Sequence, residues 1–362
     1  MSGMTRLAMG VVAMALAAPA SAQDTYPDIE INGRLHQQFY WFGNDAYETE
    51  VGPESNVFTR RARIEASGRI AENVSFKIQP SFEGGRESGV RLRDAYIDVR
   101  LSREKARSTV VLRAGQDKRP FGRYELLSST NLISIERGAG DGLPGAASGD
   151  LFDSAEFLSH DVGASLRLEH ELDEDRTVGL TVGAYNGQGE SLDDVNDRKS
   201  FGARATAAVT DRLDVGASWF AHDGIVDDGV TVDSSFTNHA WGLDAQYGKP
   251  GDERLFALVE YLQGDDASAA KLRMRGLQLV AAWHFRGAAP DARLYAVEPF
   301  ARLDLADPDA DGQDDRVTTL TAGVGLYLSA KAWLRVGYER QSFEADGAGS
   351  VSGIRSMLAV SF

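Results

Sequence analysis

Basic side chains recur at every second position in several stretches of this chain, which places them on one face of an extended strand. Arg61 and Arg63 alternate with Ala62 and Ile64, and Arg113 stands between apolar neighbours. A guanidinium group offers a rigid fork of hydrogen-bond donors that suits the oxygen atoms of phosphate and carboxylate. Several such groups facing water would favour small anions over cations.

A second group of basic residues lies in a long irregular segment, Thr109–Arg137. The segment begins as an alternating strand and then runs into the sequence QDKRPFG, and no comparable strand pattern returns until about residue 160. Long irregular segments in an otherwise regular chain are most often functional. Because Lys118, Arg119 and Arg123 lie in it, we expect this segment to contribute to anion binding.

The rest of the chain must position these residues, and its alternation of apolar and polar residues predicts β-strands. Ile29, Ile31 and Leu35 share one face, whereas Asn32 and His36 share the other. Five such strands precede the irregular segment. Eleven more are predicted near 160–170, 176–186, 199–209, 213–222, 238–248, 254–263, 272–286, 293–305, 316–328, 332–343 and 353–362.

Short and long connections alternate between these strands, as they do in bacterial outer-membrane barrels, where short turns face the periplasm and long loops face outward. The polar faces carry Arg, Lys, Glu and Gln, and the apolar faces are often Ala, Val and Leu. This pattern favours lipid outside and water inside over a soluble β-sandwich. The predicted fold is all-β, a transmembrane antiparallel barrel of about sixteen strands, with the long third outer loop folded into the lumen.

Aromatic residues near the predicted strand ends suit the girdles that outer-membrane barrels place at both membrane surfaces. They are Tyr40, Trp41, Trp219, Trp241, Trp283, Trp333 and Tyr338.

The overall composition excludes several classes of protein. The chain has 362 residues and no cysteine, so disulfides and thiolate chemistry are excluded. Its net charge of −16 disfavours nucleic acid as a partner. No apolar run of about 18 residues lies in the body of the chain, which argues against a transmembrane helix.

The N-terminal segment predicts export. Arg6 precedes the apolar run Leu7–Ala18, and Ala20–Ser21–Ala22 forms a small-residue cleavage site. We therefore expect residues 1–22 to be a cleaved signal peptide and residues 23–362 to form a single transmembrane barrel domain in the bacterial outer membrane. An N-terminal anchor helix is the alternative.

Acidic residues concentrate in the predicted outer loops, whereas basic residues lie on the predicted inward faces of strands. Such a basic lining favours anions. In the alternative interpretation, the inward arginines pair with carboxylates and only brace the wall. The expected partners are then Glu65, Glu83, Asp94, Asp98 and Glu298.

Five ordered motifs resemble the phosphate-selective porin O and P family. They are RRARI at 60–64, RDAYID at 93–98, GQDKRPFG at 115–122, IER at 135–137 and EPFAR at 298–302. Together with the terminal Phe362, they spread the resemblance over the whole mature chain.

The resemblance implies a trimeric sixteen-stranded porin, an inward third loop, and an arginine ladder leading phosphate to a constriction. Arg60 and Arg61 match the family's paired arginines, Asp94 its aspartate, and Lys118 a loop lysine. The acidic, lysine-poor outer loops depart from members with strong phosphate preference. Strand alternation also places Arg60 on the lipid side, which a β-bulge, a position near the rim or a different register would resolve.

Other constellations are weaker. Asp307, Asp309, Asp311 and Asp315 form part of a calcium-loop pattern, but the final bidentate glutamate is missing. The six histidines show no zinc-site spacing. Ser154, His160 and Asp161 are close in sequence, which does not establish a catalytic triad.

The sequence therefore predicts a passive outer-membrane channel for small anions, phosphate among them, that is neither an enzyme nor a cofactor protein. A general diffusion porin without marked selectivity is the main alternative, and a plugged structural or adhesive barrel is another. Expected partners are outer-membrane lipid, small anionic solutes and two further copies in a homotrimer. The candidate anion-binding residues are Arg60, Arg61, Arg63, Lys77, Asp94, Tyr96, Arg113, Lys118, Arg119 and Arg123.

Overall fold

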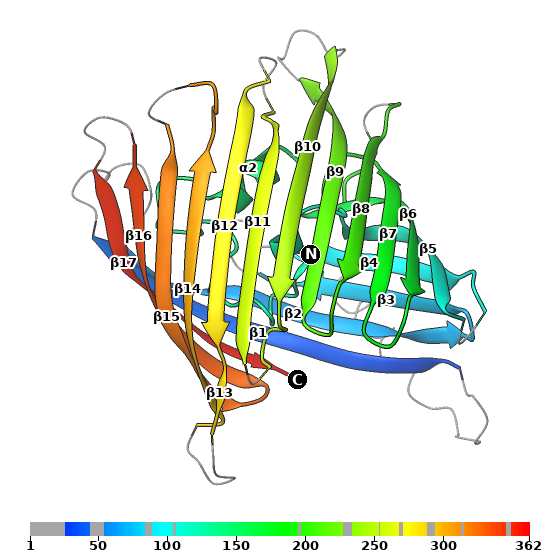
Figure 1. Cartoon of the computed structure of the whole chain (residues 1–362), viewed down its shortest axis with the longest axis horizontal. Helices are drawn as coiled ribbons and strands as arrows, with labels where there is room; N and C mark the ends of the chain where they lie inside the picture. Colours follow the sequence, from blue (N-terminus) through cyan, green and yellow to red (C-terminus); the bar gives the residue numbers. More distant parts are fainter. Residues whose placement is uncertain are drawn as a thin grey trace, which may run out of the picture.

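The chain forms a single sheet of strands that closes on itself (Figure 1). The computed structural model describes residues 26–43, 54–83, 89–103, 106–194, 197–226, 234–252, 254–267, 271–287, 294–312, 315–344 and 349–362. The predicted signal peptide lies outside these residues. Each strand pairs with its neighbours in antiparallel fashion, and β1 pairs with both β2 and β17. The ring is therefore complete.

The strands before the long loop are β1 (Asp28–Gly43), β2 (Ser55–Ala71), β3 (Val74–Ser81), β4 (Arg91–Arg100) and β5 (Ser108–Lys118). Two short helices follow, α1 (Arg123–Leu126) and α2 (Ser148–Ser154). The remaining strands are β6 (His160–Glu171), β7 (Thr177–Tyr185), β8 (Ser200–Ala208), β9 (Leu213–Val226), β10 (Ser234–Tyr247), β11 (Leu255–Asp265), β12 (Arg273–Trp283), β13 (Phe285–Arg286), β14 (Ala296–Asp307), β15 (Val317–Ser329), β16 (Ala332–Phe343) and β17 (Ser350–Ser361).

The 17 labelled strands correspond to sixteen barrel strands, because β12 and β13 are two parts of one strand and both pair with β14. The break between them falls at His284. The predicted strand number and antiparallel barrel are confirmed. Most predicted strand ranges differ from the observed ones by only a few residues, since water on one face and lipid on the other impose a strict period of two.

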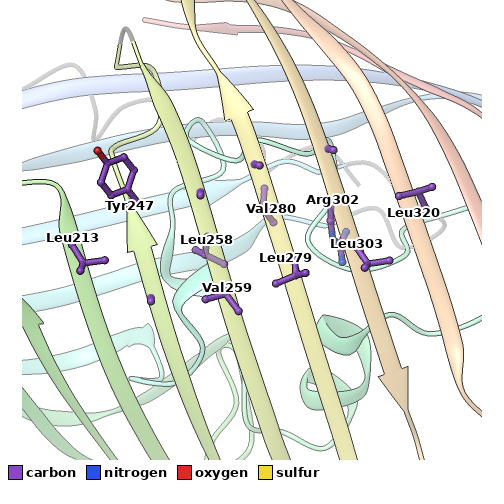
Figure 2. A pocket seen from close by; sticks show the side chains of 13 residues that line it. Leu213, Tyr247, Leu258, Val259, Leu279, Val280, Arg302, Leu303 and Leu320 are labelled. Atoms are coloured by element: carbon purple, nitrogen blue, oxygen red, sulfur yellow. The ribbon is translucent and has the colours of Figure 1, made fainter.

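The outer face of the barrel is apolar. Large side chains such as Ile31, Leu243 and Leu279 are exposed on it. Over β9–β15 the outward residues Val259, Leu279, Leu303 and Leu320 surround a shallow hollow of about 450 Å³ (Figure 2). Such a surface matches the hydrocarbon of a membrane. None of the helices in the described part of the chain is long and apolar enough to cross a membrane.

Five of the seven predicted girdle aromatics lie on this outer face, namely Trp41, Trp219, Trp241, Trp283 and Tyr338. The prediction is wrong for Tyr40 and Trp333, which are only 2% and 3% exposed and point inward. Tyr40 packs with Phe42, Ala139 and Leu143, and Trp333 packs with Ile135. Both aromatic rings therefore support the long loop instead of the membrane interface.

The segment 119–159, which we call L3, lies inside the ring of strands. In Figure 1, α2 lies behind β12, and α2 contacts both β12 and β14. Phe121, Phe152 and Phe157 of L3 form an apolar cluster with Phe220 of β9. A second cluster joins Tyr124, Leu132 and Ile133 of L3 to inward residues of β11, β12 and β14. L3 is therefore held against the β9–β17 side of the barrel by buried apolar contacts.

Candidate functional site

A β-bulge in β2 brings two consecutive arginines to the same face of the wall. His36 of β1 pairs with Arg61, but the next residue, Gln37, pairs with Thr59, so Arg60 is an extra residue. An extra residue of this kind changes the alternation of side chains. Of the three explanations for the position of Arg60, the structure shows the bulge.

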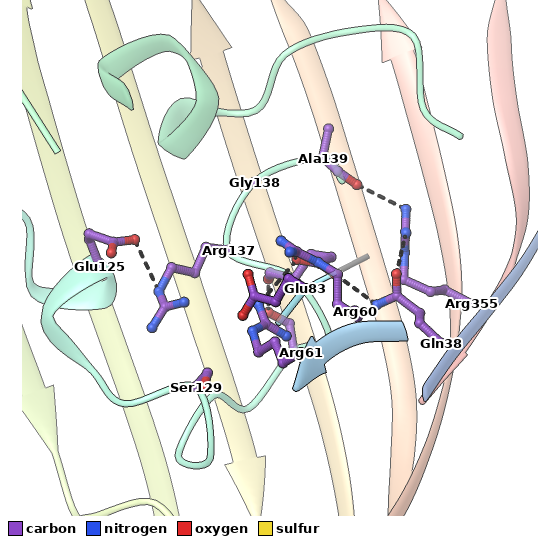
Figure 3. A network of polar contacts seen from close by, with 12 residues as sticks. Gln38, Arg60, Arg61, Glu83, Glu125, Ser129, Arg137, Gly138, Ala139 and Arg355 are labelled. Carbon is purple, nitrogen blue, oxygen red and sulfur yellow. Dashed lines mark hydrogen bonds and ion pairs between the residues drawn. The ribbon is translucent and has the colours of Figure 1, made fainter. Parts of the chain in front are cut away.

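Both arginines bind one carboxylate of L3, Glu136. Figure 3 shows Arg60 and Arg61 beside Gln38 and Arg355 in this network of polar contacts. Arg60 donates from Nε and Nη2 to its two oxygens at 2.7 and 3.0 Å. Arg61 Nη2 lies 3.5 Å away, and Gln38 Nε2 donates at 2.7 Å. Burial disfavours the charged form of Glu136, but Arg60 and Arg61 hold its pKa well below the usual range. This cluster fixes the middle of L3 to the wall.

A second irregularity occurs in β4, in the RDAYID motif. Ile78 of β3 pairs with Ala95 and Pro80 pairs with Leu92, so Arg93 and Asp94 together oppose one residue. Both side chains join the inner network. Arg93 pairs with Glu83 and Glu190, and Asp94 pairs with Lys77 and His160. In both motifs, an extra residue in the strand pairing thus brings two consecutive charged side chains to the inner face.

Arginines of β14, β16 and β17 hold L3 by its backbone carbonyl groups. Arg302 Nη1 donates to the carbonyl oxygens of Glu136 and Gly138, at 3.1 and 2.8 Å. Arg355 Nη2 donates to the carbonyl of Ala139 at 2.9 Å, and Arg335 donates to that of Leu132. These guanidinium groups are 0–2% exposed. They are therefore buried, and their role is to hold L3 in place.

The other side of the barrel stays open to water. Its inward basic side chains keep 12–33% of their surface exposed, and they are Arg34, Arg63, Lys77, Arg93, Arg113 and Arg167. L3 packs mainly on the β9–β17 wall, and we call the space in front of the partly exposed side chains of β1–β6 the passage.

The cations along this passage share carboxylates in a continuous network. Glu65 lies 3.6 Å from Arg34 and 3.0 Å from Lys77. Glu83 binds Arg63 as well as Arg93. His160 contacts both Asp94 and Glu190, at 3.2 and 3.3 Å. The five carboxylates expected in the bracing interpretation are all paired, namely Glu65, Glu83, Asp94, Asp98 and Glu298.

Further along the wall, Arg113 lies over the ring of Tyr96, with its Cζ 3.4 Å from the ring centroid. This is a cation–π contact. Arg113 also pairs with Asp98 and Asp117 at 2.7 and 2.6 Å, and Arg167 binds Asp117 too. Two cations and two carboxylates balance here, so this part of the lining is close to neutral.

Positive charge is in excess at two places where L3 meets the wall. Lys118 and Arg137 share the single carboxylate of Glu125, at 2.8 and 3.1 Å. Burial opposes its ionisation, but Arg137 and Lys118 lower the pKa of Glu125 to about 2. Arg60 and Arg61 likewise share Glu136. Among the described residues, each cluster therefore has two cations for one carboxylate.

Three of the ten candidate residues are not open to the passage as predicted. Arg61 is 2% exposed and is bound to Glu136. Arg119 is 1% exposed and is paired with Asp161 and Glu156, so it braces the start of L3. Arg123 contacts Gln246 and Asp214 on the far wall. Sequence reasoning missed Glu136, Glu190, His160 and Arg137. Of these, Glu136 and Arg137 lie in the quoted IER motif, whereas nothing in the sequence shows which strands the other two reach.

The calcium-loop pattern does not converge in the described part of the chain. Asp311 pairs with Arg273, Asp307 lies 3.7 Å from Arg316, and Asp315 accepts a hydrogen bond from the Asp309 backbone. No three metal-ligating side chains come together among the described residues. Asp45, Glu48, Glu50, Asp227, Asp228, Asp233 and Asp314 of the predicted acidic loops lie outside those residues.

Two of the three residues considered for a catalytic triad, His160 and Asp161, are bound to other partners. His160 contacts Asp94 and Glu190, and Asp161 binds Arg119. Their contacts hold the wall and the loops together.

Sixteen strands form a closed ring with an apolar outer face and charged inner side chains, and a loop lies inside the ring. These features define a porin-type barrel of the bacterial outer membrane. The chain belongs to the phosphate-selective porin O and P family, whose sequence model matches residues 29–239. A comparison with curated proteins gave no match.

Several solved porins share the fold. An anion-selective porin from Comamonas acidovorans is 14% identical, with 92% of this chain and 99% of that one covered and a TM-score of 0.62. OmpF of Salmonella typhi, solved with daunomycin, is 12% identical, with 92% and 97% covered and a TM-score of 0.61. OmpT of Vibrio cholerae, solved in its trimer form, is 12% identical, with 92% and 99% covered and a TM-score of 0.56.

Proposed function

We propose that this porin conducts small anions, phosphate among them, through the passage between L3 and the wall of β1–β6. The observation that carries the proposal is the excess of positive charge in the Glu136 and Glu125 clusters. Two cations share one carboxylate in each, and both clusters border the passage. A field of this sign inside low-dielectric walls concentrates anions. Family membership and the anion-selective relative support the same direction.

Mechanistically, anions diffuse passively along half-exposed donors. Arg34 is the least tightly paired of them, since its nearest carboxylate oxygen is 3.6 Å away and its Nη1 binds two serine hydroxyls of L3. Arg60, 32% exposed, and Lys118, 19% exposed, keep part of their surface for solutes while bound to L3. Charge-assisted hydrogen bonds from such groups replace part of the water around an anion.

The test is the reversal potential of single channels in a potassium chloride gradient. A charge about 8 Å from a passing ion changes its energy by roughly 0.5 kcal/mol in water, which is about a twofold change in concentration. We therefore expect Lys118→Gln and Arg60→Gln each to lower the chloride-to-potassium permeability ratio about twofold or more. Arg176→Gln, an exposed pair with Asp173 on the short turn after β6, is the matched control and leaves the ratio unchanged.

Cation preference of the wild-type channel contradicts the anion proposal, and absence of conductance contradicts the channel. Phosphate is tested separately, as a blocker of chloride current that competes at the same clusters. Weaker block in Lys118→Gln supports phosphate as a solute, whereas equal block in both proteins contradicts binding at Lys118.

A general diffusion porin without marked selectivity is the second candidate. The observation that favours it is the extensive pairing of inward arginines with carboxylates along β1–β6. In that case both glutamine variants change the reversal potential as little as Arg176→Gln does.

The organisation of the functional unit follows from the same family. We propose that residues 23–362 form one barrel domain, exported to the outer membrane after cleavage behind residue 22, and that three copies assemble. The relative solved in a trimer form supports the assembly. N-terminal sequencing of the mature protein tests the cleavage site, and light scattering of the detergent-solubilised protein tests the trimer.

A further inference from the structure

A hollow lies on the outer face of the barrel, away from the passage, where β1, β16 and β17 meet. Its volume is about 570 Å³. It is lined by Trp41, Gly43, Tyr338, Gly349, Ser350, Ser352, Gly353 and Ile354. Five of these eight residues are glycine or serine. The hollow thus exists because small residues stand where a barrel wall ordinarily carries larger side chains.

Two aromatic rings border the hollow on one side. Ile354 pairs with Trp41 of β1 and with Tyr338 of β16, so the three side chains form one row across the strands. Trp41 is 50% exposed, Tyr338 49% and Ile354 43%. Amphipathic rings in this position mark the level of lipid head groups. Flat ring faces also suit the apolar C–H faces of sugar rings.

Hydrogen-bond donors lie directly beyond the rings. Arg340 is two residues past Tyr338 on the same outward face and pairs with Ser352. Its Nη2 donates to Ser350 Oγ at 3.3 Å. Among the described residues, Arg340 has no carboxylate within ion-pair distance. By contrast, Arg273 at the start of β12 and Arg316 just before β15 are paired with Asp311 and Asp307. Arg340 is thus an outward guanidinium with capacity for an anion.

The order of these features along the strands indicates the ligand. The hollow lies at the strand ends that lead into the 44–53 and 344–349 connections, the same end as L3 and opposite the short turns. Apolar residues face hydrocarbon first, then come the two rings, and then Arg340 with its serines. A lipid that presents sugar at ring level and phosphate just beyond it matches this order.

We propose that this hollow binds the head group of a phosphorylated glycolipid in the outer leaflet of the membrane. Trp41 and Tyr338 pack against the sugar, while Arg340, Ser350 and Ser352 donate hydrogen bonds to phosphate. The proposal rests on the outer-membrane orientation given under the proposed function, but not on the channel's ion selectivity. The site is separate from the passage, because its side chains face away from the lumen.

The probe is lipid A carrying two phosphates, compared with its dephosphorylated form and with phosphatidylglycerol. Binding to the purified full-length protein in detergent is measured by native mass spectrometry. One lost charge-assisted hydrogen bond corresponds to about a tenfold change in affinity. We expect lipid A to bind wild type about tenfold more tightly than either comparison lipid. Arg340→Gln should remove the preference for phosphate, and Trp41→Leu should weaken both glycolipids alike.

Arg212→Gln is the matched control, because Arg212 lies over exposed Tyr247 at the opposite rim, with its Cζ 4.9 Å from the ring centroid, and should not alter binding. Arg340→Lys, which keeps the charge, should bind at an intermediate level and guards against misfolding of Arg340→Gln. Unchanged lipid A affinity in Arg340→Gln overturns the proposal. So does phosphatidylglycerol binding as tightly as lipid A. If the protein conducts anions but does not prefer lipid A over the comparison lipids, only the lipid-site proposal is contradicted. If it binds lipid A but does not conduct, only the channel proposal is contradicted.

Discussion

At the scale of single residues, the charge of the inner wall depends on how many cations share each carboxylate. Glu190 is informative because it comes from the connection after β7 and enters the passage network. It contacts Arg93 and His160, and burial is outweighed by these two partners, so that the pKa of Glu190 is lowered. Glu190 thus stays ionised at neutral pH and cancels positive charge that Arg93 would otherwise present to solutes.

Glu190→Gln is therefore expected to raise the chloride-to-potassium permeability ratio, by about twofold or more on the same Coulomb argument. Arg93 then shares Glu83 with Arg63, which creates a third cluster of two cations for one carboxylate. Reversal potentials in bilayers measure the effect. Asp193→Asn, an exposed residue of the same connection, is the control for a general loss of loop charge. A ratio that falls in Glu190→Gln contradicts the role given to this residue.

Asp153 of α2 predicts a dependence of selectivity on pH. Its side chain faces water inside the barrel, but the low-dielectric protein around it and the neighbouring carboxylates Glu125 and Glu156 disfavour its charged form and raise its pKa to about 6. Acidification from pH 7.5 to 5 neutralises Asp153 and should raise anion preference in chloride. Asp153→Asn should show the higher ratio at both pH values. An equal pH response in wild type and variant contradicts the assignment.

The same shift has a consequence for stability, with a definite sign. The folded-state pKa of Asp153 lies above the value of about 3.9 in unfolded chains. The folded protein therefore binds this proton more tightly, and the contribution of Asp153 to stability rises as pH falls through 6.

At the scale of elements, L3 acts as a strut between two walls. Glu136 binds Arg60 and Arg61 on β2, while its own carbonyl accepts from Arg302 on β14. Breaking one partner of a buried ion pair costs about 3–5 kcal/mol, because the remaining charge is left uncompensated. Arg61 is 2% exposed, whereas Arg60 is half-buried and can regain water.

Glu136→Gln is accordingly expected to lower the free energy of unfolding by about 3 kcal/mol. Urea denaturation of the protein in detergent measures this change. Glu156→Gln serves as the control, since Glu156 is 45% exposed and its partner Arg119 keeps Asp161. The two variants losing equal stability would show that Glu136 is no special anchor.

The elements also show what could be predicted from sequence. The strand positions could be predicted from the alternation of apolar and polar residues, because lipid on one face and water on the other impose this alternation on every strand. Strict alternation along residues 58–70 predicts that Phe58 shares the outer face with Ala62 and Ile64, and this prediction is wrong for Phe58. Downstream of the bulge the expected faces hold, but upstream of it they are exchanged, and Phe58 packs inward against Tyr40. Alternation cannot reveal a bulge when both faces of a strand end carry apolar residues.

At the scale of the whole molecule, the barrel closes where the two ends of the described chain meet. Phe362 and Gly33 exchange backbone hydrogen bonds of 3.1 Å in both directions. The Phe362 ring covers Gly33 so closely that an added Cβ there would lie 2.2 Å from a ring atom. The glycine therefore provides the space that the terminal ring occupies on the barrel seam.

Phe362→Ala is expected to reduce the amount of folded barrel in the outer membrane, since the seam loses the contact between the Phe362 ring and Gly33. The fraction that migrates as folded protein without heating is the measure. Phe285→Ala, which removes another exposed ring on the apolar surface, is the control. Equal yields of the two variants contradict a special role for the last residue.

The overall barrel was predictable from one chain, but the location of the passage was not. The sequence showed basic lumen faces on both halves of the barrel, including Arg302, Arg335 and Arg355. Only the packing of L3 decides that these three are buried and that Arg34, Arg63 and Arg113 remain open. Such a choice depends on contacts between residues more than 90 positions apart, which no local pattern encodes.

The bulge in β2 has a consequence for how such channels diversify. Because Arg60 is an extra residue with no partner on β1, loss of its single codon would restore regular pairing while leaving the hydrogen-bonded ladder intact. The inner wall would lose one cation, while Thr59 and Phe58 would keep their present partners and faces. Gene lineages can thus alter permeability by one in-frame insertion or deletion, without rebuilding the wall that carries it.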